Sequence, residues 1–207
     1  MEKLLRGVVN FQKEDFESHK ELFKELGKQQ KPHTLFIGCS DSRIVPNLIT
    51  KTLPGELFVV RNIANLVPPY RTSTDYAATT SAIEYAVIVL EVENIIVCGH
   101  SNCGGCACIH KEEAYFENVP NVKKWLELTD GIKEKVNAQI PKDDILSREW
   151  LTEQINIVEQ IKRLFSYPFV VDKYKKGNLK IYGWYYIIET GEVYNYNSEK
   201  QIFELIK

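Results

Sequence analysis

Two short segments carry most of the side chains that could bind a metal or move a proton. "CSDSR" at 39–43 sets a cysteine, an aspartate and an arginine at alternate positions, and "HSNCGGC" at 100–106 sets a histidine three residues before a cysteine. Thiolate and imidazole groups select zinc over magnesium or calcium. We therefore interpret Cys39, His100 and Cys103 as ligands of one zinc ion. Three protein ligands leave the fourth tetrahedral position open, which is typical of a catalytic zinc site.

Asp41 and Arg43 suit a supporting role beside such an ion. In an extended or tightly turned segment, residues two apart point the same way, so the carboxylate and the guanidinium can pair. Pairing holds Asp41 ionised and aimed at a water on the metal, and it restrains Asp41 from binding the metal itself. We predict that Asp41 and Arg43 form a catalytic pair.

Other interpretations of the cysteines and histidines compete with this one. "CGGC" at 103–106 has the spacing of a redox pair, and Cys106 with Cys108 could complete a closed zinc site. The closed site leaves Cys39 unexplained, and a redox pair does not account for the histidine that precedes it or for the Cys/Asp/Arg motif that converges on it. Cys98 lies in an apolar run and is predicted to be a small buried residue. Three histidines have no partner motif and are predicted to be ordinary helix or surface residues: His19, His33 and His110.

Three apolar runs must position the two motifs. "HTLFIGC" at 33–39, "ELFVVRN" at 56–62 and "NIIVCGH" at 94–100 read as buried strands separated by helical patterns, which favours a parallel sheet with crossover helices. Ligands of such sheets bind beyond the carboxyl ends of the strands, where the strand order reverses. If the first and third strands are neighbours, Cys39 and His100 meet in space.

The remaining segments complete an α/β fold with helices on both faces of a mostly parallel sheet. Residues 11–26 are predicted to form an amphipathic helix that ends at Gly27. Residues 75–92 read as a mostly buried helix capped by Thr74 or Asp75. Residues 179–197 read as an antiparallel hairpin at the sheet edge, with its turn at Thr190 and Gly191.

Composition narrows the class of protein. The 207 residues include 26 basic and 28 acidic side chains, a formal net charge of −2 that gives no electrostatic case for nucleic acid. No apolar run is long enough to span a bilayer, and the N-terminus shows no signal peptide. We expect one domain over residues 1–207, in a cytoplasmic protein that binds no membrane.

Taken together, "CSDSR" and "HSNCGGC" resemble the two zinc-binding motifs of the β-class carbonic anhydrases. The resemblance extends through "GELFVVRNIANLVPPY", "AIEYAV" and "IYGWYYIIETGEVY", and so covers residues 30–194. It implies one Zn²⁺ per subunit and the reversible hydration of carbon dioxide to bicarbonate and a proton, by attack of a zinc-bound hydroxide. It also implies a homodimer or homotetramer in which residues 1–28 form a helical arm packing on a partner subunit.

The resemblance also assigns roles to single residues. Cys39, His100 and Cys103 match the family's zinc ligands, and Asp41 with Arg43 match its catalytic dyad. The residues that match substrate contacts are Gln30, which acts across the dimer interface, Gly104 through its backbone N–H, and a carbon dioxide pocket of Phe58, Ile63 and Tyr85.

One position separates subtypes of that family. Bicarbonate-regulated bacterial members carry a tryptophan three residues before the first zinc cysteine, and this chain has Phe36 there. With Gln30, this implies the plant-like subtype, which is open and active near neutral pH; Arg61 suits either subtype. Two other functions remain open on the same ligands: a zinc hydrolase of carbon disulfide or carbonyl sulfide, and a zinc or thiol sensing module.

Overall fold

A computed structural model describes residues 1–71 and 77–207 of the chain. The chain divides into two compact units, Met1–Lys31 and Pro32–Lys207. The predicted cap residues Thr74 and Asp75 lie outside the described residues.

The first unit is helical but not one continuous helix. The predicted helix over 11–26 is interrupted at Glu14 and His19, which gives α1 (Glu2–Lys13), α2 (Asp15–Ser18) and α3 (Lys20–Leu26). Rings of Phe11, Phe16 and Phe23 pack together across these breaks, with centroids 5.2 to 6.4 Å apart. The spacing of the aromatic residues predicted one helix, but in the structure these residues bring three short helices into contact.

The second unit is built on one sheet. Among the described residues, six strands run in the order β2-β1-β3-β4-β5-β6. β1 pairs in parallel with both β2 and β3, so the predicted neighbours are adjacent, and β4 is parallel to β3. The strands are β1 (Thr34–Cys39), β2 (Leu57–Asn62), β3 (Asn94–His100), β4 (Lys180–Tyr186), β5 (Val193–Asn197) and β6 (Ile202–Leu205).

The predicted hairpin near the C-terminus is present as β4 and β5. These strands are antiparallel, and the turn between them includes Gly191 at a φ of 76°, a left-handed conformation that glycine adopts without strain. A further antiparallel strand, β6, pairs with β5 and forms the edge of the sheet.

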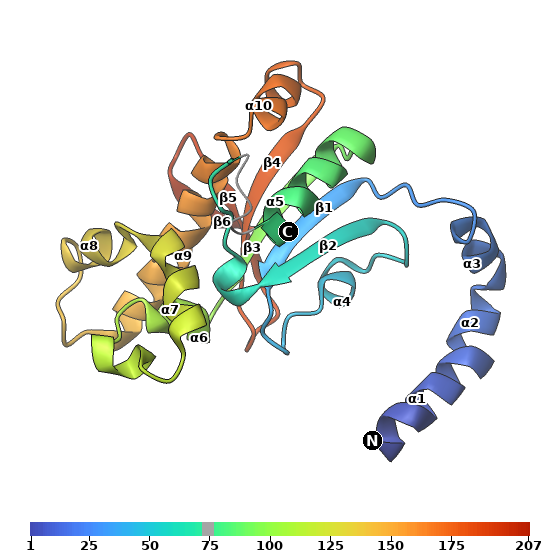
Figure 1. Cartoon of the computed structure of the whole chain (residues 1–207), viewed down its shortest axis with the longest axis horizontal. Helices are drawn as coiled ribbons and strands as arrows, with labels where there is room; N and C mark the ends of the chain where they lie inside the picture. The colour runs from blue at the N-terminus through green and yellow to red at the C-terminus, as the bar shows by residue number, and fades with distance from the viewer. Residues whose placement is uncertain (72–76) are drawn as a thin grey trace. The chain divides into compact units, whose positions relative to one another are not determined.

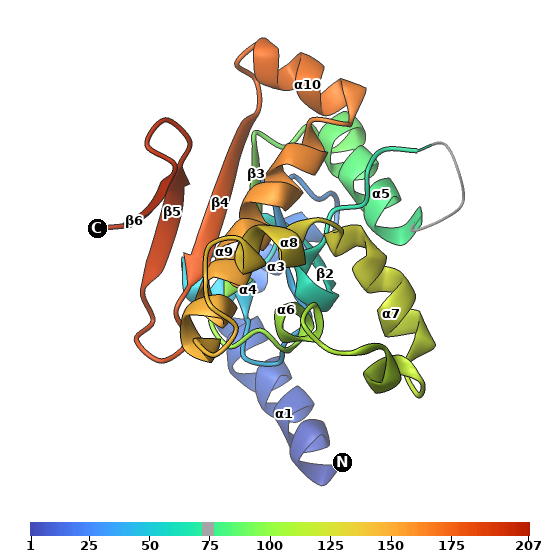
Figure 2. The ribbon, with the colours of Figure 1, turned by 90° about the vertical axis from the view of Figure 1, so that its left-hand side faces the viewer.

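Helices surround the sheet, as Figures 1 and 2 show. The longest, α9, lies against β3 and β4 (Figure 2). The predicted helix over 75–92 appears as α5 followed by a π-helical turn, η2. The helical elements of this unit are α4 (Pro46–Thr50), η1 (Ile63–Asn65), α5 (Ala77–Glu84), η2 (Tyr85–Val89), α6 (Gly104–Cys108), η3 (Glu113–Phe116), α7 (Pro120–Leu126), η4 (Glu127–Thr129), α8 (Ile132–Asn137), α9 (Ile145–Leu164) and α10 (Pro168–Lys175).

The two faces of the sheet are packed differently. On one face, odd-numbered residues of β1 and β3, such as Ile37 and Val97, join the main core with Ile157 of α9. On the other, Phe36, Ile96 and Cys98 form a smaller buried cluster against aromatic side chains of β4. No helix of the described residues is long and apolar enough to cross a membrane.

Candidate active site

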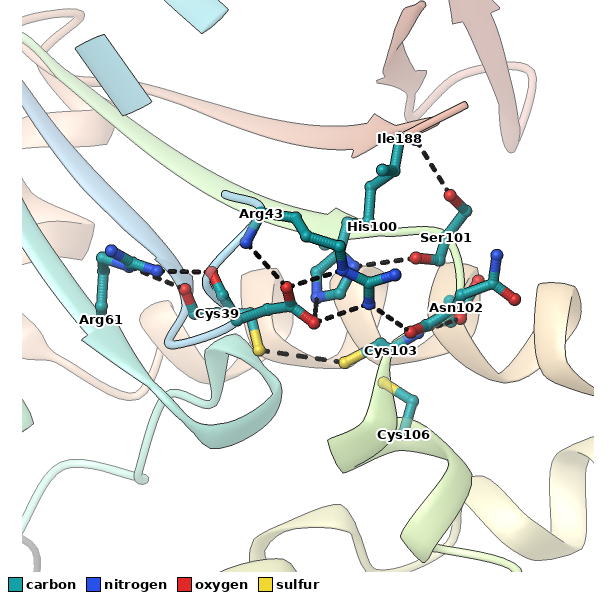
Figure 3. A network of polar contacts seen from close by, with 12 residues as sticks. Cys39, Arg43, Arg61, His100, Ser101, Asn102, Cys103, Cys106 and Ile188 are labelled. Carbon is teal, nitrogen blue, oxygen red and sulfur yellow. Dashed lines mark hydrogen bonds and ion pairs between the residues drawn. The ribbon is translucent and has the colours of Figure 1, made fainter. Parts of the chain in front are cut away.

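Two strand ends and one helix start converge on a buried cluster. Cys39 is the last residue of β1, His100 is the last residue of β3, and Cys103 immediately precedes α6. Their sulfur and nitrogen ligand atoms all lie within 4.8 Å of one another, and the two sulfur atoms are 4.0 Å apart (Figure 3). The residues are only 4, 1 and 2% exposed. The strand order reverses between β1 and β3, so the cluster lies where an open α/β sheet binds its ligands.

The imidazole of His100 is oriented for a metal. Its Nδ1 lies 2.9 Å from the carbonyl oxygen of Ser101, so Nδ1–H donates to that oxygen and the lone pair is on Nε2. Nε2 is buried and has no hydrogen-bond partner among the described residues. Since a buried polar atom without a partner is costly, a cation at this point satisfies what the protein leaves open.

The two thiols offer ligands for the same cation. Hydrogen bonding to Cys103 and burial raise the pKa of Cys39 to about 12. Hydrogen bonding to Cys106, followed by burial, raises the pKa of Cys103. A divalent cation stabilises the two thiolates that burial disfavours, so the three residues fit a metal ion.

Asp41 lies beside the cluster and is held by Arg43. The guanidinium donates from Nε to Oδ1 at 2.9 Å and from its NH2 nitrogen to Oδ2 at 2.7 Å, and the backbone N–H of Arg43 donates to Oδ1 at 2.9 Å. These hydrogen bonds hold the pKa of Asp41 well below its usual range. Oδ2 lies 3.9 Å from Nε2 of His100, so the predicted pair is formed and its carboxylate borders the cluster.

Arg61 fixes the backbone of the first motif, a role that we did not predict. From β2 it donates to the carbonyl oxygens of Cys39 at 2.9 Å and of Asp41 at 2.5 Å (Figure 3). The one sequence feature that could have indicated this role is the position of Arg61, a charged residue directly after the apolar run "LFVV". Arg61 therefore positions both the ligand and the carboxylate.

A buried carboxylate supports the second motif. Glu153 of α9 accepts the backbone N–H of Cys103 at 2.8 Å and the hydroxyl of Tyr185 at 2.7 Å. Burial raises the pKa of Glu153. Nothing in the local sequence of α9 identifies this role, because both partners are distant along the chain.

The predicted substrate residues fall into separate places. A Cβ atom on Gly105 would lie 2.9 Å from the side chain of Ile63, so Ile63 closely approaches the start of α6, where Gly104 is exposed. Phe58 and Tyr85 pack against each other, with centroids 5.9 Å apart. Phe58 pairs with Leu35, four residues and roughly 13 Å before the end of β1.

Ile63 and Gly104 are thus brought near the cluster of their own chain, whereas Phe58 and Tyr85 form a separate pair. Gln30 belongs to the Met1–Lys31 unit. Its contact with substrate stays a prediction.

The remaining cysteines lie outside the metal-ligand set. Cys98 is buried as predicted, and burial raises its pKa to about 12. The sulfur of Cys106 accepts a weak hydrogen bond from Asn156, and that of Cys108 lies 3.7 Å from the hydroxyl of Tyr115. In the described part of the chain, Cys39, His100 and Cys103 form the one cluster suited to a metal, so the closed site with Cys106 and Cys108 is not formed.

A buried Cys₂His cluster beside an oriented carboxylate, at the switch point of a parallel sheet, defines a metal-dependent α/β enzyme. A family profile described as carbonic anhydrase matches residues 34–193. A carbonic anhydrase of Helicobacter pylori (strain J99) is 44% identical over 204 residues, which cover 97% of this chain and 92% of that protein. One from Synechocystis is 38% identical over 200 residues, covering 95% and 71%.

Solved structures agree. The β-carbonic anhydrase CcaA superposes with a TM-score of 0.94 at 37% identity, covering 100% of this chain and 92% of that one. One of two tetrameric β-carbonic anhydrases from Sordaria macrospora gives 0.82 at 31% identity, covering 94% and 95%. The chain belongs to the carbonic anhydrase family, in its β class. It is an enzyme that hydrates carbon dioxide.

Proposed function

We propose that this chain hydrates carbon dioxide reversibly with one Zn²⁺ held by Cys39, His100 and Cys103. One observation carries the proposal: the buried Nε2 of His100, which has no hydrogen-bond partner among the described residues, lies with two thiols beside an ionised Asp41. The donor set of two sulfurs and one nitrogen suits zinc and leaves a fourth position for chemistry. When bound, zinc lowers the pKa of a coordinated water toward neutrality.

The protein supplies orientation and charge around that water. Arg43 holds both carboxylate oxygens of Asp41, so the carboxylate would accept a hydrogen bond from a water at the open metal position in one fixed direction. The backbone N–H of Gly104, at the first position of α6, has no partner within that helix and would donate to a bicarbonate oxygen. Ile63 supplies apolar surface for carbon dioxide at the same place.

The arrangement of Asp41 favours the plant-like subtype. Its carboxylate is paired with Arg43 and is not a third anionic ligand in the cluster, which corresponds to an open site. Because its pKa is depressed, Asp41 is ionised above its unfolded-state value near 4 and loses that state only in stronger acid. A rate change between pH 6 and 9 therefore belongs to another group.

We also propose that the active species is a homodimer or homotetramer with Gln30, Phe58 and Tyr85 completing the pocket of a neighbouring subunit. The separation of the Phe58–Tyr85 pair from the cluster of its own chain supports this arrangement. The similar enzyme from Sordaria macrospora is one of two β-carbonic anhydrases described as tetrameric.

We also propose a cytoplasmic location, because the five cysteines are free and thiols stay reduced in the cytoplasm. Cell fractionation tests this location.

Stopped-flow hydration of carbon dioxide from pH 6 to 9 on zinc-loaded protein tests the function. We expect the rate to rise with pH and to fall about 100-fold in Asp41→Asn, since the amide has no negative charge and keeps only one of the two acceptor oxygens. The matched control is Asp172→Asn, an exposed aspartate on α10, which should retain the full rate.

The zinc content of the same samples shows whether a low rate is due to missing zinc or to a site that does not hydrate carbon dioxide. Zinc-loaded wild-type protein without hydration anywhere in this range contradicts the proposal. Release of sulfide from carbon disulfide or carbonyl sulfide by such a protein would assign the site to the alternative substrates.

A further inference from the structure

A second cavity lies apart from the metal cluster. Its volume is about 440 Å³, and its walls come from the end of α6, from α8 and from the first turn of α9. Cys39, His100 and Cys103 do not line it, and neither do Asp41 and Arg43. Carbon dioxide hydration as proposed above makes no use of this cavity.

The walls of the cavity carry an excess of positive charge. Four cationic side chains line it, against two carboxylates, which leaves two positive charges uncompensated. No described carboxylate lies within 4.0 Å of any of the four cationic groups. The cationic residues are Lys111, Lys133, Lys142 and Arg148, and the acidic ones are Glu112 and Glu149.

Arg148 is the buried member of this set, only 9% exposed. Its guanidinium donates to the carbonyl oxygen of Ile140 at 3.0 Å and to the side-chain oxygen of Asn137 at 2.6 Å, so both acceptors are neutral. A buried guanidinium gains most from a carboxylate or a phosphate, which it binds through two parallel hydrogen bonds. Among the described residues, no carboxylate forms an ion pair with this guanidinium.

The positive charge around the cavity also acts on His110. Its Nδ1 lies 3.3 Å from a nitrogen of Arg148, and its Nε2 lies 2.7 Å from the hydroxyl of Thr152. Burial, with the charges of Arg148 and Lys133, lowers the pKa of His110. The ring is therefore neutral at pH 7, and its contact with Arg148 does not compensate the guanidinium.

We propose that this cavity binds a phosphate-class oxyanion, with Arg148 as its buried anchor and Lys133 and Lys142 as more exposed contacts. A phosphate group carries close to two negative charges at neutral pH, which matches the excess charge of the walls. The volume is in the range of cavities that hold whole small molecules, so a phosphorylated metabolite suits it better than a lone monovalent ion.

The site is a neighbour of the active site but is chemically distinct from it. A smaller cavity of about 120 Å³ shares Ala107, His110 and Glu149 with it and reaches Cys103 and Glu153. The three shared residues border both cavities, and only the smaller cavity is lined by a residue of the metal cluster, Cys103. Binding at the second cavity can be measured directly, without an activity readout.

Isothermal titration calorimetry of pyrophosphate into the zinc-loaded full chain, at constant ionic strength set with chloride, tests the proposal. We expect saturable binding that weakens at least tenfold in Lys133→Gln/Lys142→Gln, because each substitution removes one cation from the cavity. The matched control, Lys175→Gln/Lys176→Gln, removes two exposed lysines at the end of α10 and should bind as the wild type does.

Because calorimetry measures anion binding and not activity, its result does not depend on the result of the hydration assay. Arg148→Gln should abolish binding, and circular dichroism checks that this variant is folded; the lysine variants decide the question if it is not. Absence of binding by the wild type at 10 mM pyrophosphate, or equal affinity in the two lysine double variants, overturns the proposal. Equal affinity would place the anion elsewhere, for example on the metal.

Discussion

At the scale of single residues, the site depends on groups that hold other groups in place. Ser101 fixes which nitrogen of His100 is free, Arg43 fixes the carboxylate of Asp41, and Arg61 fixes the backbone that carries both Cys39 and Asp41. Supporting contacts of this kind commonly change metal affinity or activity by 10- to 100-fold when they are removed.

We expect Arg61→Gln to lower kcat/KM for carbon dioxide by about tenfold, because two carbonyl oxygens lose their donor and the first motif loosens. A positioning role further predicts weaker zinc binding in a competition with a chromogenic chelator. Arg71→Gln, at an exposed arginine, is the control. Unchanged activity and zinc affinity in Arg61→Gln would show that the motif holds its shape without this contact.

The residues that could be predicted from the sequence are those whose chemistry is local. Asp41 and Arg43 are two positions apart, and the cysteines and His100 end apolar runs or begin the next helix, so strand order alone brings them together. Arg61 and Glu153 could not be assigned because their partners lie 22 and 50 residues away. Such roles exist only once the sheet and α9 are packed.

At the scale of elements, the close packing of α9 against the sheet keeps the support of Cys103 in place. A Cβ atom on Gly183 of β4 would lie 2.5 Å from Ile161 and 3.0 Å from Ile157, and one on Gly99 of β3 would lie 2.7 Å from Ile157. The two glycines therefore let α9 approach β3 and β4 closely enough for Glu153 to reach the backbone of Cys103.

We expect Gly183→Val to destabilise the protein by about 1–3 kcal/mol, since the added carbons overpack a full core. A lower urea midpoint with an unchanged slope measures this change. In Gly104→Ala the added carbon meets nothing within 4 Å, so that variant should keep the wild-type midpoint. Equal midpoints for both variants would contradict close packing at α9.

Elements were predictable where the apolar pattern was long and regular, and not elsewhere. The three buried strands and the hairpin were found because their runs are apolar and bounded by turns. The breaks at Glu14 and His19 were missed because both residues are compatible with a helix, and β6 was missed because four residues carry little periodicity.

At the scale of the whole molecule, the first unit offers apolar surface without a core of its own. None of its three helices buries a side chain, and Leu4 and Val8 of α1 are 68% and 56% exposed. Residues four apart lie on one face of a helix, so these two side chains form part of a continuous apolar strip. This strip supports the proposed subunit contact.

We expect Leu4→Glu/Val8→Glu to sediment as a monomer and to lose at least 90% of the hydration rate, because charges on the strip oppose its burial and the pocket then lacks Gln30, Phe58 and Tyr85 of a neighbour. Sedimentation velocity and stopped-flow assays on the same sample measure both effects. Asn10→Asp, at an exposed position neither three nor four residues from Leu4 or Val8 on the same helix, controls for added charge. A monodisperse, fully active monomer would contradict the proposal.

The pairing of β1 with β3 also determines when, during folding, the three candidate metal ligands come together. Thr34 and Asn94, at the start of these strands, are 60 residues apart, so their pairing requires the closure of a long loop, a slow step compared with the formation of helices. Until that loop closes, the thiol of Cys39 is far from His100 and Cys103. The complete set of three ligands therefore exists only after β1 has paired with β3, so assembly of these two strands comes before full coordination of a metal.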